Sequence, residues 1–397
     1  MKISNFRSVK SQTVSVAPIT VFYGPNSTGK SSFLYAMAVF RNIALNPNQQ
    51  PLGFFNVGFA NLGDFERVVH DHKQRNFISF EIESEQSEVK LRYEASIRGT
   101  EGKFRLTADG ALKLALEVPC TFPYPLNGRD QKDIEYDGKT LNVSWNGVTA
   151  TVTPKDQSPE SVQTATTVNE LLNRPIEELR RTEFVPLKRG FSKPNYNPVP
   201  LTPLLLGEDE VATYLANNMF LQGKVSTFLE KILDREFRVH VIPGTASFSM
   251  FTIEKPGGTT VDVINDGFGV NQVIWLLAKS LRDDVDLVCL EEPEIHLHPS
   301  AVRKLAQGIA ELAKKGTKRF IITTHSEVLL TAILGMVSQN RLRPEDISCY
   351  LTSKDEVETR LERQKIEADG QVEGGLRSFV EAELEDVTAF LSPKDNR

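Results

Sequence analysis

The segment GPNSTGKS, residues 24–31, constrains this chain more than any other part of the sequence. It has the pattern G-x-x-x-x-G-K-S and stands between an apolar run, PITVFY, and a stretch with apolar residues at helical spacing. Glycines let backbone N–H groups turn toward phosphate oxygens, and a following helix adds the positive end of its dipole. We therefore predict that this loop binds the phosphates of a nucleotide.

The side chains of the loop have separate predicted roles. Lys30 is expected to reach the β- and γ-phosphates, and the hydroxyl of Ser31 is expected to bind Mg²⁺. The alternative is a glycine turn before a helix that carries Lys-Ser without binding a nucleotide. The loop reads phosphates and not the base, so it does not separate ATP from GTP. The predicted nucleotide-binding residues are Gly24, Asn26, Ser27, Thr28, Gly29, Lys30, Ser31 and Ser32.

A second motif, CLEEPEIHLHPS, contains the carboxylates that a phosphate loop needs. The run VDLVCL predicts a buried strand ending at Glu291 and Glu292, and α/β sheets bind ligands at the carboxyl ends of their strands. We predict that Glu291 holds Mg²⁺, directly or through water. The alternative is a zinc site made by three alternating residues, Glu294, His296 and His298. Because a proline at the start of the next helix puts both histidines in a connecting loop, and no further ligand cluster is visible, we favour the magnesium interpretation.

Two shorter signals complete the set. IITTHS predicts a buried strand that ends at His325, at the same edge of the sheet, where the side chain would sense a γ-phosphate. A structural histidine is the alternative. NDGFGVNQ, residues 265–272, puts two glycines before a helix, which is a second anion-binding helix terminus.

Composition excludes several classes of protein. Hydrophobic residues make up 40% and charged residues 25% of the 397 positions, which is ordinary for a globular protein with two domains, or one large domain with an insertion. The net charge of −6 argues against a uniformly basic nucleic-acid coat. Cys120, Cys289 and Cys349 form no CxxC pair, so we expect neither a disulfide framework nor a thiolate metal site. No run approaches the roughly 18 apolar residues of a membrane span, and the N-terminus lacks an apolar signal. We expect a cytoplasmic, soluble protein without a membrane partner.

The order of GPNSTGKS, DGFGVNQ, LEEPEIHLHP and TTHS resembles the ABC-type ATPase heads of the SMC, RecF and OLD lineage. The sequence is most similar to the AAA-15/AAA-21 class of OLD-like and PtuA-like anti-phage ATPases. ISNFRSV at the N-terminus and FVPLKRG near the middle also resemble that class. The resemblance covers residues 1–75 and 182–335. It implies an α/β P-loop NTPase of the ABC-ATPase type, with an antiparallel β subdomain and an inserted helical lobe.

In that family two heads enclose ATP and Mg²⁺ between one phosphate loop and the partner's signature, so the resemblance implies a homodimer or a higher homo-oligomer. It implies that Glu292 polarises the attacking water and that His325 holds the γ-phosphate and that water, with Lys30 as the third catalytic residue. Gly267, Gly269 and Asn271 would face the γ-phosphate of the partner in trans. The sequence departs from ABC transporters in two ways: Glu291 replaces the usual Asp, and the signature is not LSGGQ. A Q-loop glutamine is not identifiable among Gln49, Gln50 and Gln74.

Changes of pattern divide the chain into five expected segments. They are an N-terminal part of the head at 1–75, an antiparallel β meander at 76–155, a mainly helical insertion at 156–236, the rest of the head at 237–340 and a strand and helix tail at 341–397. The insertion holds a basic cluster, which is either a nucleic-acid or partner surface or a solvated charged face. Its residues are Arg180, Arg181, Lys188, Arg189 and Lys193, with Phe184, Phe191 and Tyr196 between them.

The tail bears on nuclease activity. OLD nucleases carry a Toprim domain after the head, but the tail has neither a D-x-D pair nor enough length, so we expect no nuclease within this chain. A separate effector, a nuclease or a toxin, is then expected as a partner. A capping-box pattern from Ser378 to Glu381 predicts a final helix.

We therefore expect an ATP-hydrolysing ABC-type ATPase that dimerises around ATP and Mg²⁺ and acts as the sensor or scaffold subunit of an anti-phage defence or DNA-maintenance system. One alternative is a RecF-like repair ATPase, which salt-dependent binding to double-stranded DNA would favour. Another is the nucleotide-binding subunit of a transporter, against which the signature and the large insertion speak. A third is a nucleotide-binding switch that barely hydrolyses.

Overall fold

The computed structural model describes residues 1–202 and 207–376, which form two compact units. Unit 1 consists of Met1–Ser15, Ser31–Thr182 and Lys354–Arg360. Unit 2 consists of Val16–Lys30, Glu183–Ser353 and the described residues from Leu361 onward. No helix in either described range is long and apolar enough to cross a membrane.

Unit 1 is built on antiparallel strands. Its larger sheet has the order β2-β1-β4-β5-β6-β7, and a smaller sheet has the order β10-β9-β8. The alternating pattern of the sequence predicts such strands, since one face of each is buried and the other is wet. The strands are β1 (Lys2–Phe6), β2 (Val9–Thr13), β4 (Ile78–Gln86), β5 (Val89–Arg98), β6 (Glu101–Gly110), β7 (Leu114–Thr121), β8 (Asp130–Tyr136), β9 (Lys139–Trp145) and β10 (Ala150–Pro154).

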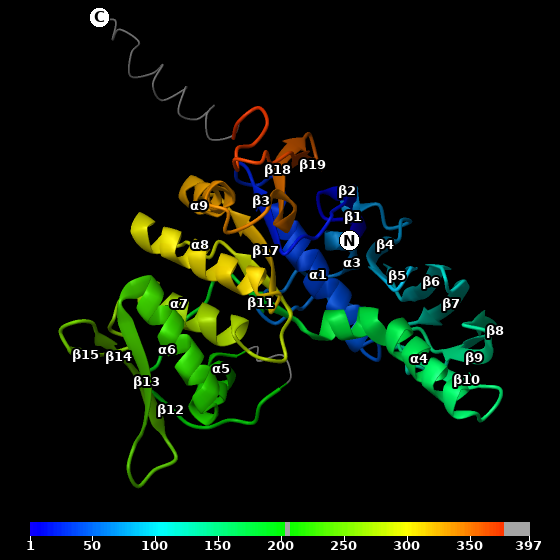
Figure 1. Cartoon of the computed structure of the whole chain (residues 1–397), viewed down its shortest axis with the longest axis horizontal. Helices are drawn as coiled ribbons and strands as arrows, with labels where there is room; N and C mark the ends of the chain where they lie inside the picture. Colours follow the sequence, from blue (N-terminus) through cyan, green and yellow to red (C-terminus); the bar gives the residue numbers. More distant parts are fainter. Residues whose placement is uncertain (203–206, 377–397) are drawn as a thin grey trace, which may run out of the picture. The chain divides into compact units, whose positions relative to one another are not determined.

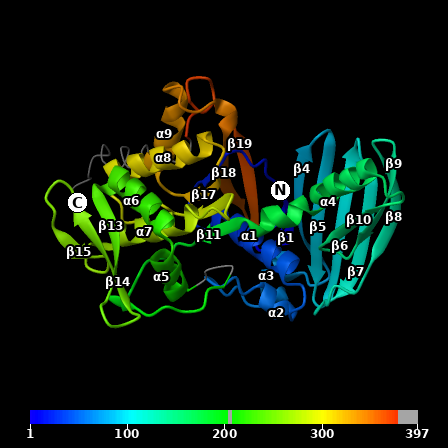
Figure 2. The ribbon, with the colours of Figure 1, turned by 60° about the horizontal axis from the view of Figure 1, so that its bottom comes forward.

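Helices pack on these sheets. The long helix α4 (Pro159–Arg180) lies against β10 and β9 (Figure 2). Phe40 of α1 (Lys30–Leu45) stacks between Phe80 and Tyr93, with ring centroids 5.7 and 5.8 Å away. The apolar positions that predict α1 are all buried, which confirms the helix. Short helical turns follow as α2 (Pro51–Phe54), α3 (Phe65–Val68) and η1 (His70–His72).

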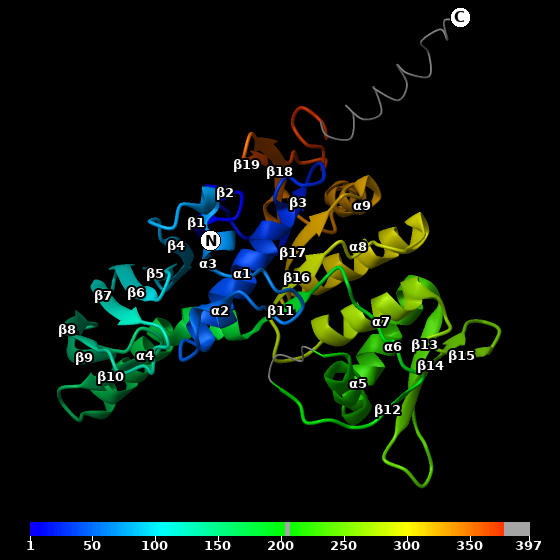
Figure 3. The ribbon, with the colours of Figure 1, turned by 180° about the vertical axis from the view of Figure 1, so that it is seen from behind.

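Unit 2 contains a mainly parallel sheet with the order β11-β16-β17-β3-β18-β19 (Figures 1 and 3). Its strands are β3 (Ile19–Tyr23), β11 (Thr182–Val185), β16 (Leu287–Glu291), β17 (Arg319–Thr324), β18 (Ile347–Asp355) and β19 (Glu358–Gln364). β16, β17, β3 and β18 run parallel, with Glu291 beside Thr323 and Thr324 beside Tyr23. The parallel pairing therefore brings the ends of β16, β17 and β3 to one edge. β17 separates the strand of the carboxylates from the strand of the phosphate loop, which the sequence did not predict.

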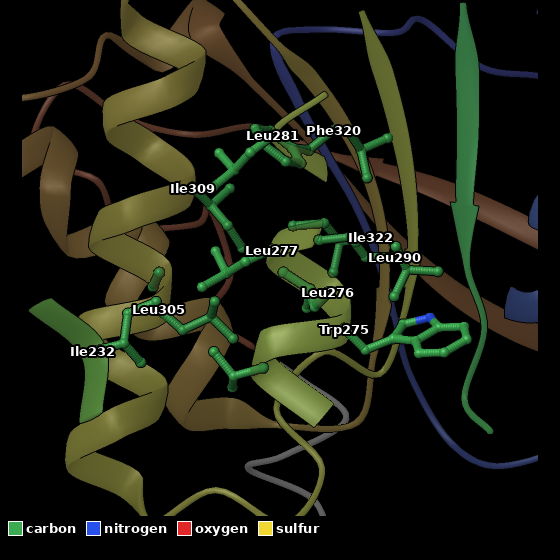
Figure 4. Close-up of a cluster of buried hydrophobic side chains, with 14 of the residues drawn as sticks. Ile232, Trp275, Leu276, Leu277, Leu281, Leu290, Leu305, Ile309, Phe320 and Ile322 are labelled. Atoms are coloured by element: carbon green, nitrogen blue, oxygen red, sulfur yellow. The ribbon is translucent and has the colours of Figure 1, made fainter. Parts of the chain in front are cut away.

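The core of unit 2 surrounds α7 (Phe268–Ser280), whose side chains are all buried from Val273 to Ser280. Figure 4 shows Leu276 and Leu277 of α7 between the sheet and α8 (Pro299–Lys314). Burying each such leucine stabilises the fold by roughly 1.5–3 kcal/mol. The other helices are α5 (Glu208–Asn217), α6 (Met219–Leu233), α9 (Glu327–Ser338) and η2 (Pro344–Asp346). A small antiparallel sheet contains β12 (Asn195–Tyr196), β13 (Arg235–Val241), β14 (Phe248–Glu254) and β15 (Thr260–Asp262).

A buried ion cluster fixes the end of α7. Glu183, directly before Phe184, accepts from Lys279 at 3.0 Å and from Arg282 at 2.8 Å, and all three side chains are almost fully buried. Removing one partner from such a cluster leaves an uncompensated charge in the core, so the cluster is a structural element of unit 2. In the tail, β18 and β19 are the strands described, whereas the predicted helix at Ser378 lies outside the described residues.

Candidate nucleotide-binding site

The predicted phosphate loop connects β3 to α1. Gly24 and Gly29 have φ values of +139° and +97°, which side-chain-bearing residues rarely adopt. A Cβ atom on Gly24 would lie 2.4 Å from the carbonyl oxygen of Thr352. The Thr28 hydroxyl donates to the carbonyl of Pro25 at 2.9 Å and lies 2.7 Å from the Thr352 hydroxyl. The end of β18 therefore fixes the loop, and glycine is required where the two backbones meet.

Lys30 is buried against the loop that precedes it. Its Nζ atom donates to the carbonyl of Gly24 at 2.9 Å and to that of Pro25 at 2.6 Å. Burial lowers the pKa of Lys30 to about 8, and the negative charge of Glu292 opposes that shift. The ammonium group thus lies at the start of a 16-residue helix with no acidic residue in its first turn. That is an arrangement that suits a polyphosphate.

Three strand ends supply the groups around this lysine. The Nε2 atom of His325, after β17, lies 3.3 Å from Oε1 of Glu292, after β16. His325 also makes a hydrogen bond with the backbone of Gly24. Burial, and then the charge of Lys30, lower the pKa of His325, while Glu292 opposes the shift. At neutral pH His325 is therefore a neutral imidazole, which can donate one hydrogen bond to a phosphate and accept another from a water.

Glu292 has an unusual backbone. Its φ of +43° lies in the left-handed region, which costs a non-glycine residue free energy. Its N–H donates to the carbonyl of Thr323 at 2.9 Å. This conformation directs Glu292 differently from Glu291, which is buried and whose Oε2 accepts from the N–H of Leu187 at 3.2 Å. Two consecutive carboxylates therefore have different surroundings, as separate metal-binding and base roles require.

Arg189 is a residue of this site whose role the sequence did not predict. Nη1 donates to the carbonyls of Pro186 at 2.9 Å and Glu291 at 2.8 Å, and Nη2 donates to the carbonyl of Glu292 at 2.9 Å. Burial lowers the pKa of Arg189 to about 10, against the charges of Glu294, Glu291 and Glu292. The resemblance of FVPLKRG to the family was the only signal for it.

The basic cluster that contained Arg189 does not form a surface with exposed aromatic rings. Its three aromatic side chains are buried, so they cannot stack on bases: Phe184, Phe191 and Tyr196. Lys193 pairs with Asp209 at 2.7 Å, and the guanidinium of Arg189 points inward. Base stacking on these three rings is therefore excluded, whereas a role of the basic side chains as a nucleic-acid or partner surface stays a prediction.

The residues of the alternative zinc site have separate structural roles. Glu294 accepts a hydrogen bond from Thr324, and its Oε2 is buried without a hydrogen-bond partner among residues 1–202 and 207–376. His298 accepts from the N–H of Ser300 at 3.3 Å and thereby caps α8. Within the described ranges, no group of three or more His, Cys, Asp or Glu side chains could hold a metal ion. Mg²⁺ needs only one or two carboxylates together with phosphate oxygens, and the carboxylate of Glu291 is a ligand of that kind.

The predicted signature forms the start of α7. Gly267 is the residue before the helix, with a φ of +82° and open space around it, and Phe268 is 75% exposed. A Cβ on Gly269 would lie 2.7 Å from the carbonyl of His296. Asn271 differs from the prediction that it faces a γ-phosphate, because its side chain is buried. It accepts from the N–H of Phe191 at 2.6 Å and donates to the carbonyl of Phe191 at 2.8 Å.

The affinity for ATP is expected to fall as the pH rises through about 8. Phosphates favour the ammonium form of Lys30, whose pKa in the free protein is about 8. Above that pH, binding must take up a proton, and the affinity falls by up to about tenfold per pH unit. Calorimetric titrations between about pH 7 and pH 9 measure this. Lys30→Arg keeps its charge and should bind with an affinity that hardly changes over this range. A constant wild-type affinity would contradict the lowered pKa.

Comparisons with known proteins show what this chain is similar to. A family model described as an AAA ATPase domain matches residues 1–136 and 208–330. The Old nuclease of Escherichia phage P2 is 20% identical over 374 residues, covering 84% of this chain and 57% of the nuclease. The chain thus spans little more than half the length of that relative. Two solved structures are similar: an SMC head bound to the C-winged helix domain of ScpA (TM-score 0.46, 11% identity, 92% of this chain and 97% of that one) and the SMC head domain from Thermotoga maritima (TM-score 0.45, 10% identity, 91% and 97%).

Proposed function

The chain belongs to the AAA ATPase domain family, and we propose that it is an ABC-type ATPase of the SMC and OLD kind that hydrolyses ATP between two copies of itself. The observation that carries the proposal is the 3.3 Å contact between His325 and Glu292 at the strand edge where Lys30 begins its helix. An acid–base pair beside a phosphate-binding lysine is what attack of water on a γ-phosphate requires.

The roles of the residues follow from their surroundings. Lys30, released from the carbonyls of Gly24 and Pro25, binds the β- and γ-phosphates together with the backbone N–H groups of the loop. Glu292 accepts a proton from the attacking water, and His325 holds that water and the γ-phosphate. Mg²⁺, when bound, neutralises phosphate charge, with Ser31 and Glu291 as its protein ligands. In this proposal the segments 1–75 and 237–340 make up the ATPase head.

The start of α7 is the proposed contact with the second copy. Phe268 is 75% exposed beside a glycine with open space around it, at the N-terminus of a 13-residue helix. A helix N-terminus that presents free N–H groups can complete an anion site on a partner. Gly267 and Gly269 are therefore proposed to face the γ-phosphate bound by the other copy.

We place this ATPase in an anti-phage defence or DNA-maintenance system, where its nucleotide state is read by a separate effector, a nuclease or a toxin. Support comes from the similarity to the Old nuclease of a bacteriophage over 84% of this chain. The nuclease activity named in that relative is not assigned to this chain. Turnover that duplex DNA accelerates would favour a RecF-like repair ATPase instead.

The test is the mass of the protein in solution with a non-hydrolysable ATP analogue. Sedimentation should show a monomer without nucleotide and a dimer with the analogue. Phe268→Glu should bind the analogue but remain a monomer, because a charge would be buried in the contact. Met219→Glu is the matched control, since Met219 is 82% exposed in the same unit and lies outside the proposed contact. If the mass of the wild type did not change with nucleotide, or if Phe268→Glu formed a dimer, the proposed dimer around ATP would be overturned.

A further inference from the structure

The loop Pro186–Phe191, called here the bridging loop, contacts both the carboxylates and the signature helix within unit 2. In its first part, Leu187 and Arg189 bind the two consecutive glutamates at the end of β16, Glu291 and Glu292. At its other end, the backbone of Phe191 makes two hydrogen bonds with the side chain of Asn271 in α7. No direct contact between Asn271 and Glu292 is needed, because the loop joins them.

We propose that Arg189 is a positioning residue that, through the bridging loop and Asn271, couples the start of α7 to the orientation of Glu292. The inference rests on the proposed function, because it concerns the general base and the contact with a second copy. Engagement of α7 with a partner's nucleotide would thereby set how fast water is activated in the site beside it. The two sites of a dimer would then turn over cooperatively.

The first step of the argument is the hold of Arg189 on the backbone. Its guanidinium binds the carbonyls of Glu291 and Glu292 at 2.8 and 2.9 Å, with two nitrogens of one planar group. Because Glu292 has a φ of +43°, its conformation persists only if its surroundings over-determine it. The fork of Arg189 is one such restraint, and a lysine, with one nitrogen, cannot reproduce it.

The second step is the rigidity of the other end. Asn271 uses both its amide oxygen and its amide nitrogen on Phe191, so α7 cannot shift without moving the loop. Gly190 has a φ of +124°, and a Cβ there would lie 2.9 Å from the amide oxygen of Asn271. The ring of Phe191 lies 5.1 Å from that of Trp275, on the same helix.

The third step is that Arg189 could adopt a second hydrogen-bonding arrangement. Nε of Arg189 and Oε2 of Glu294 are both buried and both lack a hydrogen-bond partner within the described residues. The charge of Glu294 is also the largest electrostatic influence on Arg189. A small movement of the loop would pair these two groups and loosen the hold on Glu292, which gives the coupling two discrete arrangements.

Kinetics of three variants test the proposal. Arg189→Lys is expected to lower kcat by about 100-fold, because a displacement of about 1 Å at a reacting group has that effect. The KM and the affinity for ATP should stay within about twofold, since the phosphate loop is untouched. Asn271→Ala should lower kcat and reduce the cooperativity in ATP. The double variant should be no slower than Arg189→Lys alone, because both changes break one linkage. Effects that multiply in the double variant would overturn the coupling.

Controls separate positioning from stability. Arg282→Lys changes a buried arginine of the same unit that binds Glu183 instead, so it should lower the unfolding midpoint but leave kcat near wild type. Millimolar guanidinium should restore part of the turnover of Arg189→Ala. Arg189→Lys with wild-type kcat, or with kcat and ATP affinity lost together, would contradict the proposal.

A second readout does not depend on turnover. In a Trp145→Phe background Trp275 is the remaining tryptophan, and it contacts the bridging loop through Phe191. ATP binding should change its fluorescence in this background and not after Asn271→Ala. A protein that binds ATP without any change would refute the coupling. A protein that binds no ATP would refute the proposed function instead, because the coupling can be observed only after ATP has bound.

Discussion

Replacing Glu292 by Gln is expected to lower ATP turnover by about 10²- to 10⁴-fold while leaving ATP binding almost unchanged. The amide keeps the size of the side chain and its contact with His325 at 3.3 Å, but it cannot accept the proton of the attacking water. The substitution should leave the backbone conformation unchanged, because the strained φ of Glu292 is set by contacts of its main chain with Thr323 and Arg189. Phosphate release with saturating ATP measures the loss.

The matched control for this variant is Glu230→Gln, which removes an exposed carboxylate from α6 in the same unit. It should hydrolyse ATP at the wild-type rate. The Glu292 variant should also accumulate as an ATP-bound dimer. Wild-type turnover by Glu292→Gln would mean that another group activates water, and the assignment of the two consecutive glutamates would then have to be reversed or abandoned.

Replacing Lys30 by Ala is expected to weaken ATP binding by at least about 100-fold and to remove measurable turnover, because the ammonium is the only side-chain cation assigned to the phosphates. The fold should survive. Burial lowers the pKa of Lys30 to about 8, so its charge is not a source of stability at neutral pH.

Thermal unfolding with and without ATP distinguishes these effects. For the wild type, ATP at about 100 times its Kd should add roughly 2.7 kcal/mol to the stability, whereas the variant should gain nothing. Arg303→Ala, an exposed change on α8, should respond to ATP as the wild type does. A variant that ATP still stabilises would show that the loop binds phosphates without this lysine.

The parts of the fold that sequence reasoning predicted are those written in local patterns. The strand, loop and helix around Lys30 follow from apolar spacing and two glycines, and the strand ends at Glu291 and His325 follow from buried runs that stop at polar residues. Period and motif suffice there because each pattern lies within about twenty residues. The catalytic roles of these residues stay predictions.

The parts that it missed depend on contacts between distant segments. Arg189 reads as one charge in a basic cluster, and only the fold brings it to carbonyls about a hundred positions later in the chain. The family resemblance implied that Asn271 faces a γ-phosphate in trans, but the direction of its side chain is decided by Phe191, 80 positions away. The order of parallel strands, with β17 between β16 and β3, is likewise a property of the assembled sheet.

The complete burial of α7 from Val273 to Ser280 has a consequence for how this helix can vary. Most helices tolerate substitutions on a solvent-exposed face, whereas α7 has no solvent-exposed face over these two turns. Apart from Lys279, which pairs with Glu183, these positions are packing positions, so neither a reporter group nor a further charge can be introduced there without disturbing the core. Natural or engineered change in the proposed contact with a second copy is therefore confined to the first turn, around Phe268.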